Sequence, residues 1–154
     1  MTLDLTGELD RAGIAYELIP HRPTETARDE AAELGLSLDE VAKTIVLVTE
    51  GGFVRAVLPA SERLDLHKAR ELLGSGKSTR LATEAELAGA YPMFELGAVP
   101  PFGGPAGDRT IVDRRLGGRE SVVLEAGAHD QSVRLTTEDL LRLTASELAD
   151  ICRD

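Results

Sequence analysis

A β-hairpin is the strongest structural signal in this sequence. Two apolar segments, KTIVLVT at 43–49 and FVRAVLP at 53–59, flank the turn Glu50-Gly51-Gly52. Both segments are rich in β-branched residues, and a short connection containing glycine is typical of a hairpin. The apolar run at 45–48 favours a strand that is buried on both faces. The sequence therefore predicts a hairpin whose first, buried strand begins beside the charged side chain of Lys43.

Other helices and strands are predicted on both sides of the hairpin. Patterns that cap helix N-termini occur at Ser37, Asp65 and Thr83, and at Thr136 or Thr137. Glycines at 13, 35 and 74 are typical of helix C-termini. The expected helices cover 3–12, 26–34, a short turn after 37, 66–73, 83–90, 137–143 and 145–152, and the further strands cover 14–19, 110–113, 121–125 and 132–136.

The order of these elements favours an α+β (mixed α/β) fold. Some strands follow one another directly and others are separated by helices, which indicates a mixed, mostly antiparallel sheet flanked by helices. A regular alternation of strand and helix is absent, so a doubly wound sheet is not expected. The 154 residues contain no repeat and no break in composition, and residues 1–154 are therefore expected to form a single compact domain.

Composition predicts a cytoplasmic protein. Apolar residues make up 42% of the chain, yet no stretch approaches the roughly 20 consecutive apolar residues that cross a bilayer. The acidic N-terminus does not have the pattern of a signal peptide. The single cysteine, Cys152, can form neither an internal disulfide nor a cysteine-based metal site.

The charge of the chain is unevenly distributed. A formal net charge of −10 argues against a polyanionic partner, but residues 61–80 hold five basic side chains against three acidic ones. This segment is the best candidate for contact with a phosphate backbone, although a solvated helix face explains the same pattern and is the more common case. The candidate contacts with such a backbone are Arg63, Lys68, Arg70, Lys77 and Arg80.

Most familiar enzyme motifs are absent. The three histidines, His21, His67 and His129, are far apart in sequence and have no neighbouring metal ligand, so no metal site is expected. The sequence contains no nucleophile elbow, no phosphate-binding loop and no dinucleotide-binding glycine motif. Two features remain that could support chemistry: Lys43, and a long segment rich in glycine and proline at 90–109.

Each of these two features has a structural and a functional interpretation. Lys43 could lay its methylenes along apolar surface with its ammonium in water, or it could be a partly desolvated cation that binds a carbonyl oxygen or a phosphate. The segment at 97–103, GAVPPFG, could be a rigid surface turn whose Phe102 fills the core. It could equally present backbone groups to a small polar substrate, because glycine permits close approach and proline fixes the shape of a loop.

Taken together, these features resemble a known family. Short motifs occur in order along most of the chain: His21 and Pro23, Lys43-Thr44, Asp65-Leu66, Gly97-Ala98-Val99-Pro100-Pro101 followed by Phe102-Gly103, Asp113, Gly127 and TTEDLLRL at the C-terminal end. This set resembles the YbaK family of aminoacyl-tRNA deacylases. Its members are free-standing relatives of the editing domain that is inserted in bacterial prolyl-tRNA synthetases.

The resemblance implies a function and a set of site residues. It implies a free-standing trans-editing hydrolase that cleaves the ester of mischarged aminoacyl-tRNA, with alanyl- or cysteinyl-tRNA for proline as examples. Lys43 and Gly97 are expected to be catalytic, the lysine by holding the substrate and the loop by positioning the attacking water. No cofactor and no metal are implied, and the partners are the 3′ acceptor end of tRNA and an aminoacyl-tRNA synthetase. The implied substrate-binding residues are His21, Thr44, Ala98, Val99, Pro101, Phe102, Gly103, Asp113, Gly127 and His129.

The sequence also departs from the family. Many members carry a Gly-Tyr pair and a short spacer before the loop, where this chain has AYPMFEL at 90–96. Leu96 stands where some alanine-specific relatives have a histidine, which leaves the preferred amino acid open. Two alternatives remain: a non-catalytic module that binds tRNA or a synthetase with the same fold, and an enzyme that acts on a different ester or on a nucleotide.

Overall fold

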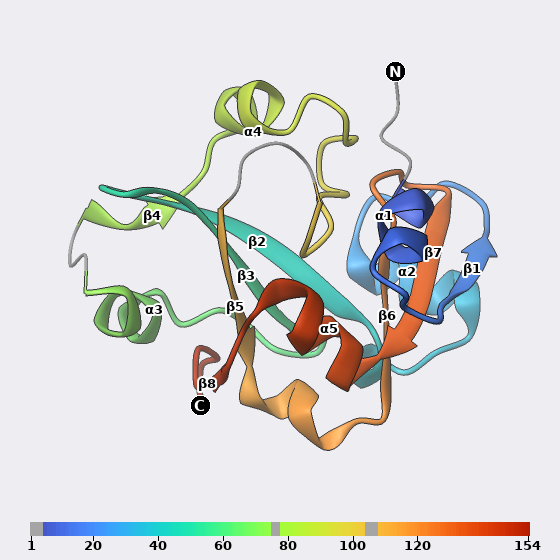
Figure 1. The fold of residues 1–154 in the computed structure, drawn as a ribbon. Helices are drawn as coiled ribbons and strands as arrows, with labels where there is room; N and C mark the ends of the chain where they lie inside the picture. Colours follow the sequence, from blue (N-terminus) through green and yellow to red (C-terminus); the bar gives the residue numbers. More distant parts are fainter. Residues whose placement is uncertain (1–4, 75–77, 104–107) are drawn as a thin grey trace.

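The predicted hairpin forms the middle of a five-stranded sheet. The computed structural model describes residues 5–74, 78–103 and 108–154. Within them, β2 (Ala42–Thr49) and β3 (Gly52–Pro59) pair antiparallel along their whole length. In Figure 1 these two strands cross the centre of the molecule, with the remaining elements arranged around them.

The described strands form two sheets. The larger has the order β4-β2-β3-β5-β8 and the smaller the order β1-β7-β6. The pairs β3–β5 and β5–β8 are parallel and the other neighbouring pairs are antiparallel, so the predicted α+β fold with a mixed, mostly antiparallel arrangement is confirmed. The prediction did not separate the strands into two sheets. The remaining strands are β1 (Glu17–Pro20), β4 (Arg80–Leu81), β5 (Arg109–Asp113), β6 (Ser121–Glu125), β7 (Gln131–Thr136) and β8 (Leu148–Ala149).

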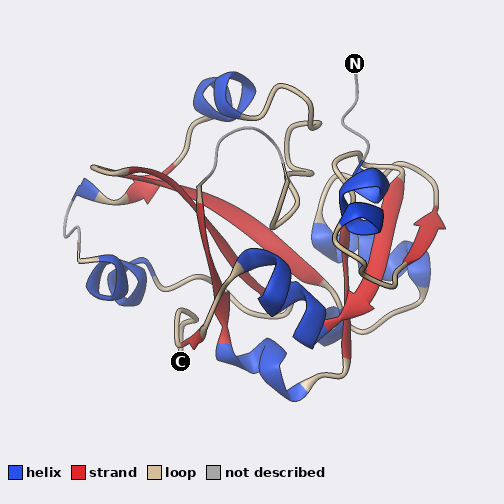
Figure 2. Ribbon diagram, in the orientation of Figure 1, coloured by secondary structure: helices blue, strands red, loops and turns tan. Residues whose placement is uncertain are grey.

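The two sheets meet at the beginning of β2. Val41 forms an isolated parallel bridge with Val123 of β6. At the other end of β2, the short strand β4 pairs only with Leu47 and Val48. Among the described residues, the edge of β2 at 42–45 therefore has no strand neighbour on that side. The two sheets diverge there, and Figure 2 shows the smaller sheet at the right of the larger one.

Most helices begin and end where capping residues predict. Thr26 accepts a hydrogen bond from the backbone of Asp29, Thr83 and Glu86 form a reciprocal capping box, and Gly35 and Gly74 end their helices in the left-handed conformation. The segment after Ser37 is a short 3₁₀ turn, as expected. The helices are α1 (Leu5–Arg11), α2 (Ala27–Leu34), η1 (Leu38–Glu40), α3 (Leu66–Leu73), α4 (Glu84–Ala90), η3 (Arg114–Gly118) and α5 (Thr137–Thr144).

The C-terminal segment differs from the prediction. Residues 145–152 do not form a helix: Ala145 has a φ of 50°, β8 pairs with β5, and Cys152 forms a bridge with Leu64. The backbone N–H of Ile151 donates to the buried carboxylate of Asp113 at 3.0 Å. Because these tertiary partners satisfy the backbone, they override the local helical pattern. The first strand is also shorter than predicted, since β1 begins at Glu17, and the two-residue strand β4 was not predicted.

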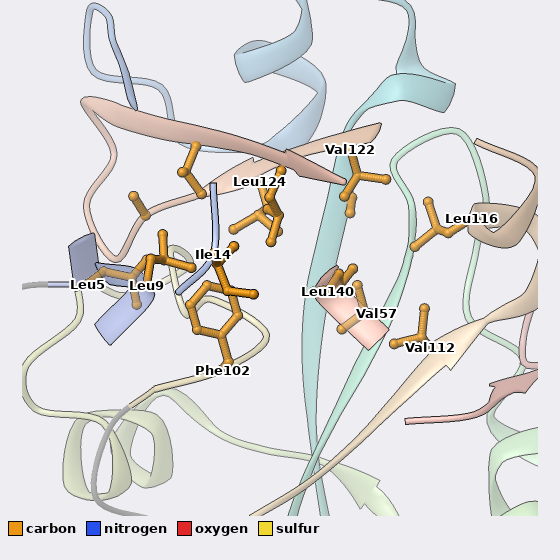
Figure 3. Packing of buried hydrophobic residues seen from close by; sticks show 14 residues of the cluster. Leu5, Leu9, Ile14, Val57, Phe102, Val112, Leu116, Val122, Leu124 and Leu140 are labelled. Carbon is orange, nitrogen blue, oxygen red and sulfur yellow. The ribbon is translucent and has the colours of Figure 1, made fainter. Parts of the chain in front are cut away.

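The largest core cluster lies between the two sheets and the helices α1 and α5. Phe102 and Ile14 lie side by side in this cluster, next to Leu5 and Leu9 of α1 (Figure 3). Phe102 is 7% exposed, so the structural interpretation of this side chain fits its position. No helix among the described residues has the length and apolar character to cross a membrane.

Candidate functional site

A small cavity lies at the open edge of β2. Its volume is about 120 Å³, below the usual range for pockets that bind drug-sized ligands or cofactors. Four parts of the chain meet there: α2, the start of β2, the loop after α4 and the end of β6. The lining residues are Ala27, Glu30, Ala42, Lys43, Thr44, Ile45, Gly97, Val99 and Glu125.

Among the described residues that line the cavity, Lys43 is the only basic one. Burial lowers the pKa of its ammonium, and the positive charges of Arg63 and Arg28 lower it further, while Cys152 and Glu62 act in the opposite direction. No hydrogen bond or ion pair joins this ammonium to another side chain within the described residues. The antiparallel ladder pairs Lys43 with Leu58, so the position of its backbone is fixed by the central hairpin. The backbone that carries this cation is therefore fixed, and the ammonium is available to an oxygen of a ligand.

Gly97 brings the backbone of the loop to the same cavity. Its φ is 82°, a conformation that favours glycine. A Cβ at this position would lie 3.3 Å from Cε1 of His129, which is closer than an ordinary contact. The next residue, Ala98, donates its N–H to Glu95 at 3.0 Å and is buried. Only a residue without a side chain fits here without strain, so the backbone at 97 forms the cavity wall.

Arg55 anchors the other end of the loop. This arginine is 2% exposed, and its guanidinium donates to the carbonyl oxygens of Pro100 at 2.8 Å and Gly103 at 2.5 Å. Its remaining hydrogen bonds go to Asp108, at 2.9 and 3.0 Å. The ring of Tyr91 lies 4.8 Å from the guanidinium carbon, and its hydroxyl donates to Asp108. The loop is therefore held by a buried, fully engaged cation.

The role of Arg55 was missed by sequence reasoning. The sequence nevertheless indicated it, because an arginine in the middle of the apolar strand FVRAVLP needs hydrogen-bond partners when the strand is buried. A further hydrogen bond holds the same loop: the hydroxyl of Thr110 donates to the carbonyl oxygen of Pro101 at 2.9 Å.

Two buried carboxyl groups also line the cavity. Glu30 of α2 is 0% exposed and Glu125 at the end of β6 is 8% exposed. Ser132 donates its hydroxyl to Oε2 of Glu30, whereas Oε1 of Glu30 and Oε2 of Glu125 have no hydrogen-bond partner among the described residues. Burial, reinforced by the charges of Glu30 and Glu95, raises the pKa of Glu125 to about 9. Burial also raises the pKa of Glu30, against the opposing effect of Ser132.

Neither carboxyl group was among the predicted site residues. Glu30 could have been noticed, because it lies between Ala27, Ala31 and Leu34 on the apolar face of α2, where a charged residue is unusual. Glu125 gave a weaker signal, as a glutamate at the end of a strand is common on exposed edges.

The two predicted histidines lie behind these carboxyl groups. Nε2 of His21 lies 2.8 Å from the hydroxyl oxygen of Ser132, which connects it to Glu30. Nε2 of His129 lies 2.5 Å from the carbonyl oxygen of Leu96, and its Nδ1 lies 3.3 Å from Oε2 of Glu125. That last contact lies outside hydrogen-bond geometry, so neither atom has a hydrogen bond to another described residue.

A second, more apolar cavity of about 230 Å³ adjoins the first. The two share Thr44, Ile45, Gly97 and Val99 in their linings. The further lining residues are Val46, Leu81, Ala82 and Leu87. Leu81 is 54% exposed, a high value for a leucine beside a cavity. The polar cavity therefore continues into an apolar surface that could receive a flat, uncharged group.

Several predicted site residues lie away from Lys43. Pro101, Phe102 and Gly103 line a separate cavity with Arg55. Asp113 is 0% exposed and caps η3. Gly127 has a φ of 90° and packs against Phe94, and Ala98 of the loop is buried and is not among the residues that line the cavity. The structure thus brings together Lys43, Thr44, Gly97 and Val99, with His21 and His129 behind the lining.

The predicted basic segment is dispersed. Lys68 forms ion pairs with Asp150 and Asp154, and Arg80 pairs with Glu86. Arg70 donates to the carbonyl oxygen of Thr79, and Lys77 lies outside the described residues. Arg63 is exposed and, together with Arg28 of α2, acts electrostatically on Lys43. Arg28, which the sequence did not single out, is therefore a better candidate for a phosphate contact than Lys68 or Arg80.

Within the described ranges, no three histidine, cysteine or carboxylate side chains are grouped as they would be in a metal site.

Comparisons with known proteins identify the family. Residues 21–143 match the model of the aminoacyl-tRNA editing domain, a range that includes all lining residues of both cavities. A relative in Escherichia coli (strain K12), the multifunctional Ser/Thr-tRNA deacylase ProXp-y, is 29% identical over 94% of this chain and 89% of its own length. A proline--tRNA ligase of Shouchella clausii is 32% identical over 75% of this chain, which corresponds to 21% of the ligase.

Solved structures have the same fold. A crystal structure described as a candidate trans-editing enzyme for prolyl tRNA synthetase superimposes with a TM-score of 0.88, at 29% identity, over 97% of this chain and 95% of that one. The hypothetical protein APE2540 gives the same TM-score at 27% identity, covering 97% of this chain and 100% of its own. The resemblance noted from the sequence is confirmed: the chain belongs to the aminoacyl-tRNA editing domain family, whose members include aminoacyl-tRNA deacylases.

Proposed function

We propose that this protein hydrolyses the ester between a wrong amino acid and the terminal ribose of tRNA. The observation that carries the proposal is the meeting of Lys43 and the Gly97 backbone in one cavity of about 120 Å³. A cavity of that size suits a small aminoacyl group and excludes the nucleotide to which it is attached. We further propose that residues 1–154 act as a single domain in the cytoplasm, with the 3′ end of tRNA as the substrate.

The chemistry would depend on positioning. The cation of Lys43 would bind an oxygen of the ester or the adjoining phosphate, where developing negative charge is stabilised. The rigid loop at 97–99 would orient a water molecule and the acyl group, since well-oriented reactants gain much of their acceleration from geometry. Thr44 is the only residue with a hydroxyl among those that line this cavity, and an activated ester does not require a strong enzymic nucleophile.

The neighbouring apolar cavity would receive the terminal adenosine. Its leucine and valine side chains offer an uncharged, apolar surface against which a base can pack. Arg28 and Arg63 would meet the phosphates that lead into the acceptor end. This arrangement would place the ester at the junction of the two cavities, where Thr44 and Gly97 belong to both linings.

The identity of the amino acid that is removed is the more specific part of the proposal. Alanyl- and cysteinyl-tRNA for proline follow from the family resemblance. Seryl- and threonyl-tRNA are added because the E. coli relative is named a Ser/Thr-tRNA deacylase. All four acyl groups are small, and pocket contacts discriminate among such groups by only about 1–3 kcal/mol.

A second candidate function is a module that binds tRNA or a synthetase without hydrolysis. It is favoured by the net charge of −10 and by the internal ion pairs of Lys68 and Arg80, both of which weaken affinity for a polyanion. A synthetase partner would then bring the tRNA to the domain and raise its effective concentration.

The test is a deacylation assay with the purified chain. Alanyl-, cysteinyl-, seryl- and threonyl-tRNA, each on tRNA for proline and on its own tRNA, are incubated with micromolar protein, and the loss of the ester is measured against buffer alone. The proposal predicts that at least one of these esters is cleaved well above the spontaneous rate. If none is cleaved and the chain still binds tRNA, the hydrolase proposal fails and the binding module stands.

A further inference from the structure

Three buried acceptor atoms without a hydrogen-bond partner among the described residues belong to side chains that line the Lys43 cavity or contact its lining. Five buried side-chain atoms in the described residues have no hydrogen-bond partner, and three of them are Oε1 of Glu30, Oε2 of Glu125 and Nδ1 of His129. Both glutamates line the cavity. Buried polar atoms are nearly always paired in folded proteins, so a cluster of three unpaired ones beside a cavity points to a ligand.

The three atoms are all suited to accept hydrogen bonds. The ring nitrogen Nε2 of His129 faces the carbonyl oxygen of Leu96, which can only accept, so the proton of a neutral ring lies on Nε2. Nδ1 then presents its lone pair toward Glu125, at 3.3 Å from Oε2. The other carboxyl oxygen of Glu30, Oε2, accepts a hydrogen bond from the hydroxyl of Ser132, and this hydroxyl also lies next to Nε2 of His21.

The electrostatics of the cluster favour a cation. Two carboxylates in a nearly dry site repel each other, and burial raises the pKa of both Glu30 and Glu125. A bound positive group would offset this repulsion and allow both carboxyl groups to ionise. A side-chain hydroxyl carries no charge and has one donor, so it would leave most of the cluster unsatisfied.

A primary ammonium has the matching chemistry. It carries one positive charge and three N–H donors, one for each of the three acceptors. Aminoacyl esters carry such a group next to the carbonyl carbon, except prolyl esters, whose ammonium is secondary and has two N–H donors. Lys43 lines the same cavity, and its ammonium repels cations and attracts the ester oxygen, so the acidic and basic side chains together favour one orientation of an aminoacyl group.

We propose that Glu30, Glu125 and His129 form the subsite that binds the α-ammonium group of the aminoacyl substrate. This inference rests on the proposed function for the identity of the ligand, and it concerns binding rather than hydrolysis. Glu30 and Glu125 touch the substrate in this account, whereas Ser132 and His21 position Glu30. The subsite makes the cavity selective for acyl groups that carry a free amine.

The test uses two ligands that cannot be hydrolysed. In one, alanine is joined to the 3′-position of adenosine through an amide in place of the ester. In the other, lactic acid replaces alanine, so that a hydroxyl stands in place of the ammonium. Both are titrated calorimetrically into the full chain at pH 7. We expect the alanyl ligand to bind at least about tenfold more tightly than the lactyl ligand, a difference of about 1.4 kcal/mol.

Variants test which residues cause the preference for the alanyl ligand. Glu125→Gln and Glu30→Gln should each reduce the alanyl preference to less than about threefold, which is close to the 0.6 kcal/mol thermal energy scale. Glu33→Gln is the matched control, because Glu33 lies on the same helix and is exposed. It should keep the wild-type preference. If Glu30→Gln does not fold, the alanyl preference of Glu125→Gln is sufficient to test the inference. This variant should fold, because the amide of glutamine has the shape of a protonated glutamate.

Proton release gives a readout that a purely structural role would not change. Titration in buffers of different ionisation enthalpy should show that the wild type releases protons when the alanyl ligand binds, while Glu125→Gln releases fewer. The inference is overturned if neither ligand binds, if the wild type binds both equally, or if Glu125→Gln keeps the alanyl preference. Each of these results leaves the deacylation assay to be judged separately, because the ligands contain no ester.

Discussion

Two buried charged clusters lie at opposite ends of the same loop, and they are satisfied to very different degrees. At the 100–103 end, Arg55 makes four hydrogen bonds to Asp108 and to two carbonyl oxygens. At the Gly97 end, Glu30 and Glu125 each have one carboxyl oxygen without a hydrogen-bond partner in the described part of the chain. The hydrogen-bond pairing of the first cluster is typical of a structural anchor. The unpaired oxygens of the second cluster are typical of a binding site.

The comparison shows which end of the loop is held rigidly and which end can bind a ligand. A buried ionic network stabilises a structure only when every partner is in place. The Arg55 cluster meets that condition and fixes the loop before any ligand arrives. The carboxyl cluster lowers stability in the absence of a ligand, and a ligand that completes it recovers that free energy as binding.

The largest expected effect comes from breaking the satisfied cluster. Arg55→Leu leaves the buried carboxylate of Asp108 and two carbonyl oxygens without their donor, so we expect a loss of about 3–5 kcal/mol in the free energy of unfolding. Urea denaturation measures this loss. Arg142→Ala, which removes an exposed arginine from α5, should change stability by no more than about 0.5 kcal/mol. A loss below about 1 kcal/mol for Arg55→Leu would show that the cluster does not anchor the loop.

A smaller effect on stability, with a large effect on activity, is expected at Gly97. Gly97→Ala introduces a Cβ at a φ of 82° and 3.3 Å from His129, so the loop must shift. We expect a cost of about 1–3 kcal/mol in stability and about a 100-fold loss in deacylation, since small misplacements of reacting groups are costly. Gly35→Ala is the matched control, because it has a similar φ of 68° and open space around it. Equal activity losses in the two variants would contradict the role of the loop.

An effect of the opposite sign, a gain in stability, is expected at Glu125. In the folded chain the pKa of Glu125 is raised to about 9, against about 4.3 for an unfolded glutamate. Between these values the folded state keeps a proton that the unfolded state has lost, so the wild type loses stability as the pH rises through this window. Glu125→Gln cannot titrate and should therefore be more stable than the wild type at pH 8 and nearly equal at pH 4.

That gain is measured by urea denaturation of both proteins at pH 4, 6 and 8. Other groups titrate in both proteins, so the difference between the curves isolates Glu125 and its neighbours Glu30, Glu95 and His129. Parallel curves would show that Glu125 is not held in its protonated form.

Much of the fold was predictable from local patterns, and the part that was not depended on distant partners. The hairpin, the capped helices and the strand at 121–125 follow from periodicity and capping chemistry, which act over a few residues. The segment 145–152 was wrongly predicted as a helix because its structure depends on Asp113 and Leu64, far away in sequence. The division into two sheets depends on the bridge between Val41 and Val123, which no local pattern indicates.

The candidate site divides in the same way. Lys43 and Gly97 could be singled out because a lysine at the start of a buried strand and a glycine–proline loop are unusual in themselves. Glu30, Glu125 and Arg55 look ordinary in sequence and become notable only through their burial and their partners. Conversely, Phe102 and Asp113 were grouped with the site by resemblance, and both lie in structural positions away from the Lys43 cavity.

The most direct test of the account is the rate of ester cleavage by Lys43→Ala. The substrate is the aminoacyl-tRNA that the wild type cleaves fastest, and the rate is measured in single turnover with enzyme in excess. We expect about a 100- to 1,000-fold loss, the range found when one charge-stabilising group is removed from an active site, with a urea midpoint close to that of the wild type. Cleavage within a few-fold of the wild-type rate would contradict the claim that this cavity and its lysine carry the activity.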